Sequence, residues 1–583
     1  MHPLSHYLDI FRKNPDLKKE HPDEVRIAFL SSFTIQGLPE TVSVVAGDEK
    51  LRVRTYTAPY DQYAQTILSE GELYAFKPHL VVLMLDPRTI FGDALLDPYS
   101  VDIGARRSLV DDAVTTITGY ARNVLSKSDA YFLVHNFAVP SKSPLGIHEE
   151  KESYGVKDAV RTFNEKLNAY GRTESRVFVF DYQGWVSQFG TDHIFDPKLY
   201  YLGDMRVSPE YFGELAKAYL PYVRALAQRT KKSIVLDLDN TLWGGVIGED
   251  GMAGIKLGPT PEGRPFMEFQ QKLLALWRRG VILAVNSNND AADVLQVLRE
   301  HPHMVLKEEH FAALQINWDS KVLKMQRLAE DIGIGLDSMV FLDDDTLNRA
   351  MVREMLPNVT TPGLPADPAE YVGFLDRLQY FDALSLTKED KERGVMYAQE
   401  RQREEFKTIT TDLGTYLKGM GIAVRIETAS PGTFPRLAQL TQKTNQFNTT
   451  TRRFTESELK KMSATQLILA VYVKDRFGDN GLTGVAIVEK GASVWDIPSL
   501  LFSCRVIGRG AEDALISHIA HLARKAGAQK LRGELVPTPK NTPVREYYKK
   551  NGFTLAKDGD VQMWEYDLKK QIPAPEYITL SIA

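Results

Sequence analysis

Short apolar segments punctuate the first 225 residues of the chain, and amphipathic stretches separate them. A strand buried on both faces is apolar at successive positions, whereas a helix covering it repeats its apolar positions every three to four residues. Helical spacing is found over 105–127 and 156–170. This alternation predicts a parallel α/β sheet within residues 1–225. Its strands are expected at 26–33, 80–85, 130–139 and 176–182.

A second alternation of the same kind occupies residues 226–373 and predicts a Rossmann-like α/β domain. A charged helical connector is expected over 374–410. Residues 411–583 then place several strands before a helix at 510–527, which is typical of a mixed α+β domain. In the middle domain, strands are expected within 233–241, 280–290 and 338–346, and helices at 264–279 and 319–332.

Composition narrows the class of protein. The 583 residues suggest three or four domains at about 150 residues each, and 43% hydrophobic residues allow each to bury a core. A net charge of −5 argues against a nucleic-acid partner. One cysteine cannot form an internal disulfide, which favours a cytoplasmic protein. No apolar run is long enough for a membrane span, and the start lacks a secretory signal.

Polar residues follow the strands of the middle domain at their carboxyl ends, where open α/β sheets bind ligands. The first strand ends in Asp237 and Asp239, the second in Ser287, and the third in Asp343 and Asp344. Carboxylates that converge on one edge repel one another unless a cation neutralises them. Clustered oxygen ligands with few histidines indicate Mg²⁺, and a nearby lysine and hydroxyl suit a phosphoryl group.

The D-x-D pair taken alone is equally compatible with a polar strand end, or with a general metal-binding pair such as that of some glycosyltransferases. The ordered set D-x-D-x-T, Ser, Lys and D-D on successive strand ends is far more specific. It resembles the haloacid-dehalogenase phosphatase superfamily. The stretch "LDLDNTLWGGVIGEDG", residues 236–251, resembles the FkbH-like branch of that superfamily.

The resemblance implies a role for each residue of the motif set. Asp237 corresponds to the nucleophile that takes the phosphoryl group, and Asp239 to the general acid and base. Thr241, Ser287 and Lys321 would bind the phosphate.

The resemblance also implies the metal ligands. Mg²⁺ would be held by Asp237, by the backbone carbonyl of Asp239 and by Asp343, with Asp344 supporting the metal from nearby.

The C-terminal part carries two further motifs. "RVIGRG" places Arg505, Gly508 and Gly510 between a strand and a helix, where exposed amides can cradle a pyrophosphate. "NTPVREYYKKNGF", residues 541–553 with Tyr547 and Tyr548, resembles the closing motif of GCN5-related acyltransferases. The resemblance implies a cleft for a phosphopantetheine arm, carried either by coenzyme A or by an acyl-carrier protein.

Two other features leave alternatives open. The stretch "LTQKTNQFNTTTRR", residues 440–453, is a polar cluster with Thr444, Asn445, Gln446 and Asn448, and a capped loop explains it equally well. Cys504 lies just before the glycine loop. A lone cysteine is most often a small core residue, but a helix N-terminus and Arg505 would favour a reactive thiolate.

The N-terminal domain resembles a degenerate, flavodoxin-like SGNH hydrolase through "FLSSF", with Ser31 and Ser32, and through Asn136. The D-x-x-H that completes such a triad is not found, since Asp192 and His193 are adjacent. Serine without a base is a poor nucleophile. We therefore expect a binding or structural domain.

The resemblance to FkbH-like proteins extends over nearly the whole chain, in the order SGNH-like, phosphatase-like and acyltransferase-like. It implies an enzyme that dephosphorylates 1,3-bisphosphoglycerate and loads the glyceryl unit onto an acyl-carrier protein in polyketide-type biosynthesis. Many relatives carry a cysteine before the motif serine, and here that position is Asn286. Either the acyl group passes directly to the carrier thiol, or Cys504 relays it, or the substrate differs.

Two other classes of function remain open on the sequence. One is a coenzyme A-dependent N- or O-acyltransferase fused to a phosphatase for another metabolite. The other is a scaffold that docks a carrier protein, which the intact acidic motif set disfavours.

Overall fold

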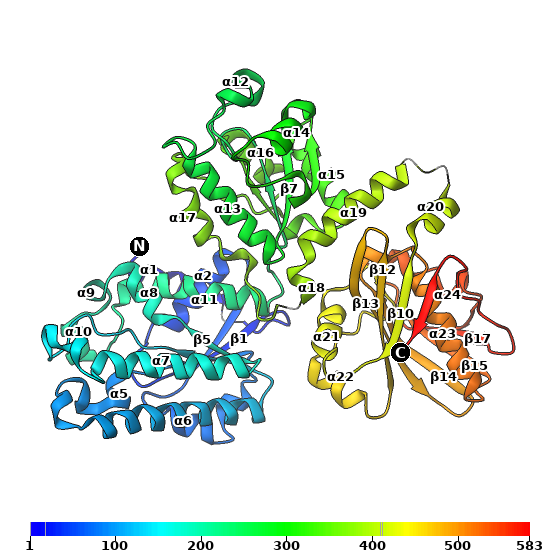
Figure 1. Cartoon of the computed structure of the whole chain (residues 1–583). Helices are drawn as coiled ribbons and strands as arrows, with labels where there is room; N and C mark the ends of the chain where they lie inside the picture. The colour runs from blue at the N-terminus through cyan, green and yellow to red at the C-terminus, as the bar shows by residue number, and fades with distance from the viewer. Residues whose placement is uncertain (1, 18, 387, 409, 411) are drawn as a thin grey trace. The chain divides into compact units, whose positions relative to one another are not determined.

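The computed structural model describes residues 2–17, 19–386, 388–408, 410 and 412–583 (Figure 1). It forms two compact units. The first contains residues 1–230 and 379–385, and the second contains residues 231–378 and 386–583. None of the helices in the described ranges is long and apolar enough to cross a membrane.

The first unit is built on a five-stranded parallel sheet with the order β2-β1-β3-β4-β5. The predicted strands are confirmed, whereas β2 was not expected, because its sequence VRTYT is largely polar and only Val53 is buried. The edge strand β5 pairs only with β4. The bounds are β1 Val25–Ser31, β2 Val53–Thr57, β3 Leu80–Met84, β4 Tyr131–His135 and β5 Val177–Phe180.

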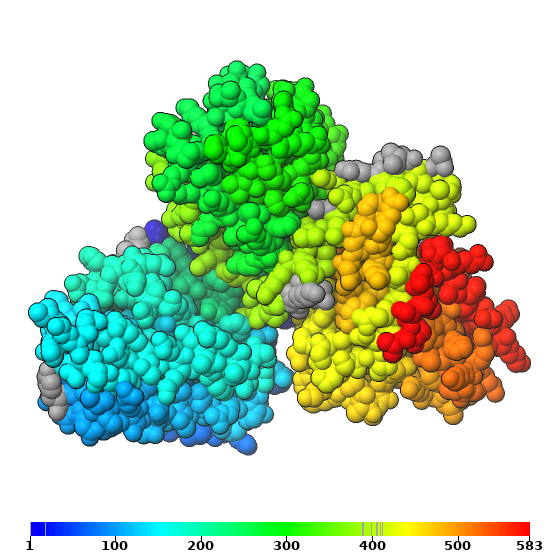
Figure 2. Space-filling view, viewed as in Figure 1, coloured from blue at the N-terminus to red at the C-terminus, as the bar shows by residue number. Residues whose placement is uncertain are grey.

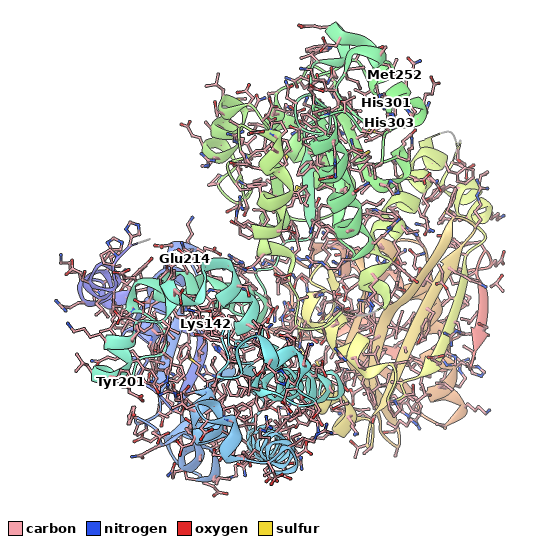
Figure 3. All side chains as sticks on the ribbon, turned by 60° about the vertical axis from the view of Figure 1, so that its left-hand side comes forward. Lys142, Tyr201, Glu214, Met252, His301 and His303 are labelled. Carbon is pink, nitrogen blue, oxygen red and sulfur yellow. The ribbon has the colours of Figure 1, made fainter. Side chains whose placement is uncertain are left out.

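Helices cover both faces of this sheet and bury a separate core on each. One core joins the sheet to α1, α2, α8 and α11, and the other joins it to α6 and α7, whose side chains lie at the surface in Figure 2. The short helix α10 leaves Tyr201 exposed (Figure 3). The bounds are α1 Leu4–Lys13, α2 Leu38–Asp48, α3 Tyr63–Leu68, α4 Glu72–Ala75, α5 Pro87–Phe91, α6 Ile103–Lys127, α7 Val156–Thr173, α8 Tyr182–Phe189, α9 Thr191–Ile194, α10 Pro197–Gly203 and α11 Phe212–Leu226.

The connector expected over 374–410 is not one continuous helix. Helix α17 ends at Arg377, and residues 379–385 return to the first unit. The Arg224 guanidinium holds this return, because it donates to the carbonyl of Gln379 at 3.0 Å and lies over the ring of Tyr380. Helix α19, Arg393–Thr408, then begins in the second unit.

The second unit contains a four-stranded parallel sheet with the order β8-β7-β6-β9. Strand β8, "FAALQI", was not expected from the sequence. The strands are β6 Ser233–Leu236, β7 Ile282–Ser287, β8 Phe311–Ile316 and β9 Met339–Leu342. The helices are α12 Ile247–Gly254, α13 Arg264–Arg278, α14 Ala291–Glu300, α15 Lys321–Ile332, α16 Thr346–Met355 and α17 Tyr371–Arg377.

A nine-stranded mixed sheet forms the rest of the second unit, in the order β16-β17-β15-β14-β13-β12-β10-β18, with β11 paired to β14. Helix α23 packs against it in one large core. The strands are β10 Ala423–Thr428, β11 Phe447–Asn448, β12 Leu467–Asp475, β13 Gly478–Lys490, β14 Val494–Phe502, β15 Lys530–Leu535, β16 Thr554–Lys557, β17 Gln562–Asp567 and β18 Thr579–Ile582. The helices are α18 Lys388–Lys391, α20 Leu413–Met420, α21 Phe434–Lys443, α22 Glu456–Met462, α23 Ala511–Lys525 and α24 Tyr547–Lys550.

Helix α19 links the two sheets within the second unit. Its Tyr397 belongs to the core of the four-stranded sheet. Its Arg403 makes a fully buried ion pair with Asp475 at the end of β12. The two sheets therefore share one compact unit, and the expected boundaries of three separate domains stay a prediction.

Candidate active site

Four predicted side chains meet at the carboxyl edge of the four-stranded sheet. Strands β6, β7 and β9 are parallel neighbours, so their last residues lie side by side. The Ser287 hydroxyl donates to Asp237 at 2.7 Å. The Lys321 ammonium contacts Asp237 at 2.8 Å and Asp343 at 3.0 Å. Residues far apart in sequence thus form one hydrogen-bonded cluster around Asp237.

Negative charge dominates this cluster. One carboxylate oxygen from each of Asp237, Asp343 and Asp344 can be chosen so that all lie within 4.8 Å of one another. Burial raises the pKa of Asp343 to about 6, with the charge of Asp237 as the next cause, while Lys321 acts in the opposite direction. Burial and Asp237 also raise the pKa of Asp344. Oxygen ligands at this spacing fit a small divalent cation.

The carboxylate of Asp239 lies outside that oxygen cluster. Its Oδ1 accepts from Trp243 Nε1 at 2.8 Å and from the Ile247 amide at 3.1 Å. Its Oδ2 accepts from Asn289 Nδ2 at 2.9 Å. These donors hold the side chain apart from the cluster, as expected for an acid and base that is not itself a side-chain ligand of the metal.

Thr241 does not reach the open edge of the sheet. Its side chain is fully buried, and its hydroxyl has no hydrogen-bond partner among the residues described. The turn around it is set by Asn240, which has φ +52° and whose carbonyl accepts from the Tyr371 hydroxyl at 2.9 Å. A direct contact between Thr241 and phosphate therefore has no support in this geometry.

Two residues that the sequence did not single out complete the site. Asn289 donates to Asp239 and also to the Ser287 hydroxyl at 3.1 Å. Arg349 donates to the carbonyls of Asp343 at 2.5 Å and Asp344 at 2.7 Å, which fixes the loop after β9. A signal for Asn289 exists in the sequence, because it follows Ser287 by two positions at a strand end.

Asn286, at the position of the cysteine in many FkbH-like proteins, supports Lys321. Its Nδ2 donates to the Lys321 carbonyl at 2.9 Å, and its own carbonyl accepts from the Lys321 ammonium at 2.9 Å. The side chain is fully buried. Asn286 therefore orients the lysine through its Nδ2 and its backbone carbonyl.

Lys324 lies one helical turn after Lys321 and is fully buried. Its ammonium donates to the carbonyl of Ser287 at 2.7 Å, to that of Asn317 at 2.9 Å and to the side chain of Asn288. It thereby ties the loop after β7 to the loop after β8. Burial lowers the pKa of Lys324 from 10.5 to about 8, with the charge of Lys321 as the next cause.

This lowered pKa predicts a change of stability with pH. Because the unfolded chain binds the Lys324 proton more tightly, the stability contributed by Lys324 should rise as pH increases from about 8 to about 10.5. We expect the free energy of unfolding of the parent, relative to that of Lys324→Met, to increase as pH rises through this window. Urea titrations of both proteins at each pH measure it. A difference that stays constant over the window would contradict the assignment.

The glycine loop before α23 is engaged within the chain. The Gly508 amide donates to the Glu512 side chain at 2.8 Å, and Gly510 has φ +83°. Glu512 is buried, its other oxygen has no partner in the described ranges, and burial raises its pKa. Arg505 donates to the Ser503 hydroxyl at 3.3 Å. The amide expected to face a phosphate therefore already binds a carboxyl group.

The gap between the parallel strands β14 and β15 is also filled. The two strands pair only from Val494 to Ile497, and β11 takes the place beside the remainder of β14. The Thr449 amide donates to the Leu500 carbonyl at 3.0 Å, and the Val536 amide donates to the Thr449 carbonyl at 2.7 Å. Part of the polar cluster at 440–453 thus fills the space between the diverging ends of β14 and β15.

Cys504 lies near the start of β6, whereas Asp237 follows the end of that strand. Cys504 is exposed and lies within electrostatic range of Lys232, which directly precedes β6. Asp237 directly follows β6. Five residues of extended chain span about 16 Å. The structure therefore does not bring the cysteine to the acidic cluster.

Tyr547 and Tyr548 of the closing motif are buried in the core of the nine-stranded sheet. The Tyr547 hydroxyl donates to the Glu512 carbonyl at 2.6 Å. Tyr547 therefore supports the glycine loop from inside the core through Glu512.

The serines of the first unit have no histidine partner among the residues described. Ser31 accepts from the Phe33 amide, and Ser32 accepts from the Asp86 amide and from the Thr89 hydroxyl. His135 bonds to a buried tyrosine instead, and burial lowers its pKa to about 3.

Two comparisons with known proteins bear on the class and the family of this chain. A solved structure of the N-terminal part of protein BF1531 from Bacteroides fragilis, containing a phosphatase domain and complexed with Mg, is 26% identical. The match covers 66% of this chain and 100% of that chain, with a TM-score of 0.59. The chain is thus a mixed α/β protein with parallel sheets. It is similar in structure to a haloacid-dehalogenase-like phosphatase domain. Residues 26–224 match the family model of the FkbH N-terminal domain, and together the two matches support an FkbH-like family.

The C-terminal likenesses are weaker. The GNAT domain of S. lividans PAT is 17% identical over 24% of this chain and 89% of that chain, with a TM-score of 0.20. The ribosomal-protein-S18-alanine N-acetyltransferase from Escherichia coli is 13% identical over 25% and 94%, with a TM-score of 0.21. Scores this low assign no function to residues 411–583. No curated protein matches the chain.

Proposed function

We propose that the chain is a Mg²⁺-dependent enzyme that dephosphorylates 1,3-bisphosphoglycerate and loads the glyceryl unit onto the phosphopantetheine thiol of an acyl-carrier protein. One observation carries the phosphatase part: Asp237 is held between the Ser287 hydroxyl and the Lys321 ammonium at the carboxyl edge of a parallel sheet. The similarity to a phosphatase domain complexed with Mg supports the same phosphatase assignment.

The residues of the cluster divide the phosphoryl transfer among them. An Asp237 oxygen attacks phosphorus, and the bond from phosphorus to the ester oxygen breaks. Asp239 gives its proton to the departing oxygen and later takes one from the attacking water, which returns phosphate and free Asp237. Lys321 and Ser287 hold the phosphoryl oxygens. Mg²⁺, held by Asp237, Asp343 and Asp344, would neutralise charge that develops on those oxygens.

Acyl transfer uses the other end of the same substrate. The carrier thiolate attacks the carbonyl carbon of the acyl phosphate, the carbon–oxygen bond to phosphate breaks, and inorganic phosphate leaves as the thioester forms. An acyl phosphate is activated for this attack and needs no further energy source. Asn286 cannot carry the acyl group, so we propose direct transfer to the carrier.

The flanking domains are assigned supporting roles. The SGNH-like first unit would bind a partner or substrate without catalysis, because its serines lack a base. The acyltransferase-like C-terminal sheet would contribute to carrier recognition. A coenzyme A-dependent acyltransferase is less well supported, since Glu512 occupies the Gly508 amide and β11 fills the gap beside β14.

Incubation with 1,3-bisphosphoglycerate, Mg²⁺ and a holo carrier protein tests the proposal. Intact-protein mass should show a glyceryl adduct on the carrier, together with release of phosphate. Apo carrier, which lacks the arm, is the matched control and should stay unmodified. Turnover of acetyl-coenzyme A without glyceryl loading would support the coenzyme A alternative, and no reaction with either would support a docking scaffold.

Cys504 should be dispensable if transfer is direct. Because Cys504 lies at the end of β6 opposite to Asp237, we expect Cys504→Ala to load the carrier within about threefold of the parent rate, a surface change of little energetic weight. Intact mass of the enzyme after incubation with substrate and no carrier should show no adduct. A hydroxylamine-labile glyceryl adduct on Cys504, lost in the variant, would overturn direct transfer.

A further inference from the structure

A small cavity of about 260 Å³ lies between the second half of α23 and the last strand, β18. Helix α23 supplies His518, His521 and Arg524, whose spacing of three residues places them on one side of the helix. No carboxylate borders this cavity in the described part of the chain. The rest of the lining is Ser517, Ala520, Gln571, Ile572, Leu580 and Ile582.

The two imidazoles of this cavity are not used elsewhere in the chain. Neither His518 nor His521 makes a hydrogen bond or an ion pair among the residues described. Burial lowers the pKa of His518, and the charge of His521 lowers it further. The two rings are therefore close enough to repel each other when both are protonated, and an anion held between them would remove that repulsion.

The guanidinium of Arg524 keeps an uncompensated positive charge. Its Nε donates to the Leu568 carbonyl at 2.8 Å, and its Nη2 donates to the Lys570 carbonyl. Arg524 pairs with no carboxylate in the described ranges. A guanidinium has five donors in a planar fork, so these two bonds fix its orientation and leave other donors for a ligand.

The nearest elements bring more positive than negative charge. Lys525 follows Arg524 on α23, and Lys569 and Lys570 belong to the segment that the guanidinium holds. The carboxylate of that segment, Asp567, accepts from the Lys569 amide at 3.0 Å. The surroundings of the cavity are therefore basic.

The strands beside the cavity do not cancel this charge. Strand β18 has no titratable side chain. On its neighbour β10, Val424 and Ile426 lie in the core together with α23, so Arg425 and Glu427 point to the opposite face of the sheet. Three more carboxylates, Glu512, Asp513 and Glu576, belong to the N-terminal end of α23 or to the loop beside it.

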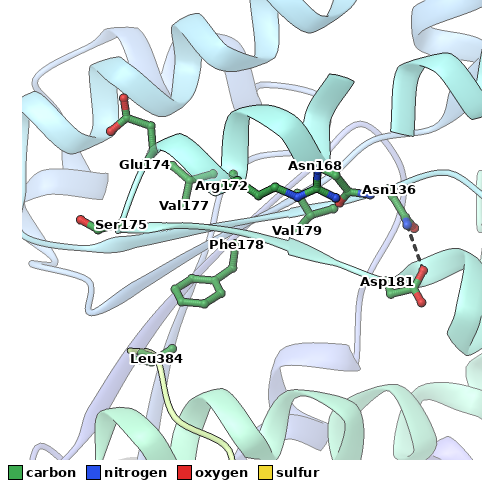
Figure 4. Close-up of a pocket in the computed structure, with 11 residues that line it drawn as sticks. Asn136, Asn168, Arg172, Glu174, Ser175, Val177, Phe178, Val179, Asp181 and Leu384 are labelled. Atoms are coloured by element: carbon green, nitrogen blue, oxygen red, sulfur yellow. Dashed lines mark hydrogen bonds between the residues drawn. The ribbon is translucent and has the colours of Figure 1, made fainter. Parts of the chain in front are cut away.

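Two larger cavities in the first unit have a different chemistry. In the one of about 630 Å³, Arg172 shares the lining with Glu174 and Asp181 (Figure 4). The other, of about 400 Å³, is bordered by Asp181 and Asp382. Of these three cavities, the one beside α23 alone has a basic lining without a carboxylate among the described residues.

We infer that the cavity beside α23 binds a tetrahedral oxyanion, the phosphate or sulfate group of a small metabolite, between Arg524 and the two imidazoles. The guanidinium fork fits two oxygens of such a group, and a protonated imidazole donates from either nitrogen. The apolar wall of Ile572, Leu580 and Ile582 receives the non-polar part of the ligand. This site shares no residue with the acidic cluster around Asp237.

Site-resolved modification with diethyl pyrocarbonate tests the inference on the full chain, because the reagent acylates neutral imidazoles and peptide mass spectrometry identifies each one. Sulfate is the probe, since its charge is constant between pH 6 and pH 8, and sodium chloride at equal ionic strength is the reference. At pH 6 we expect sulfate to slow the modification of His518 and His521 about fivefold. His148, an exposed histidine of the first unit, is the internal control and should be unaffected.

Protection should fall below about twofold at pH 8, because both imidazoles are then neutral and Arg524 alone attracts the anion. Two charge variants of the exposed His521 separate the site from a general salt effect. His521→Lys keeps the positive charge at both pH values, so sulfate should protect His518 at pH 8 as well. The matched variant His521→Asp should abolish the protection of His518.

The same measurement can overturn the inference. Equal rates for His518 in sulfate and chloride, or equal protection of His148, would show that the cavity holds no oxyanion. Protection of His518 that survives His521→Asp would have the same meaning. Protection by Zn²⁺ and not by sulfate would assign the histidine pair to a metal instead.

Discussion

Asp237→Asn is expected to lower phosphate release from p-nitrophenyl phosphate by at least about three orders of magnitude, because removing a nucleophile removes the covalent route. The amide is isosteric with the carboxylate: its single oxygen can still accept from the Lys321 ammonium, and its Nδ2 can donate to the Ser287 hydroxyl. It also removes one of the charges that raise the pKa of Asp343. The fold should therefore persist, as circular dichroism and urea titration would show.

The matched control for this variant is Asp376→Asn. Asp376 is an exposed carboxylate that pairs with Lys272 in the same unit, away from the cluster. Its loss should leave phosphate release within about twofold, since exposed pairs carry little energy. If Asp237→Asn released phosphate within tenfold of the parent, Asp237 would not be the nucleophile. Because p-nitrophenyl phosphate is a general substrate, this test is independent of the glyceryl proposal.

Lys321→Met should have the second-largest effect, a loss of about two to three orders of magnitude in kcat/KM for the same substrate. The ammonium is almost fully buried and contacts both Asp237 and Asp343. Removing it leaves two carboxylates facing each other and takes away a cation that would hold the phosphoryl oxygens. Saturating Mg²⁺ should restore only part of the activity, because the metal cannot replace the position of the lysine.

Lys272→Met provides the control for the lysine, because Lys272 is half-exposed and paired only with Asp376. It should show parent activity and parent stability. Full activity of Lys321→Met at saturating substrate, with an altered KM alone, would reassign Lys321 to ground-state binding.

Much of the site follows from sequence because strand ends are local features. Asp237, Ser287 and Asp343 each follow an apolar run that can only be a buried strand, and parallel strands bring their carboxyl ends to one edge. The pairing register of β6 with β7 and β9 then places these residues side by side. The cluster could be predicted without coordinates for that reason.

Other residues of the site could not be found in this way. Arg349 acts through hydrogen bonds to carbonyls whose positions depend on the turn after β9, and the position of Asn289 two residues after Ser287 does not by itself reveal its bond to Asp239. The burial of Thr241 depends on the left-handed backbone of Asn240 and on its bond to Tyr371. The contacts of Arg349 and the burial of Thr241 leave no periodic or compositional signal.

By itself the sequence determined the alternation of strands and helices, the sheet edge that carries the chemistry and the residues at its center, because periodicity and strand-end polarity are properties of neighbouring residues. Tertiary structure alone decided which predicted groups are free to act. It bonds Gly508 to Glu512, places β11 beside β14, and sets Cys504 at the end of β6 away from Asp237. These outcomes depend on contacts between segments far apart along the chain, which local pattern does not encode.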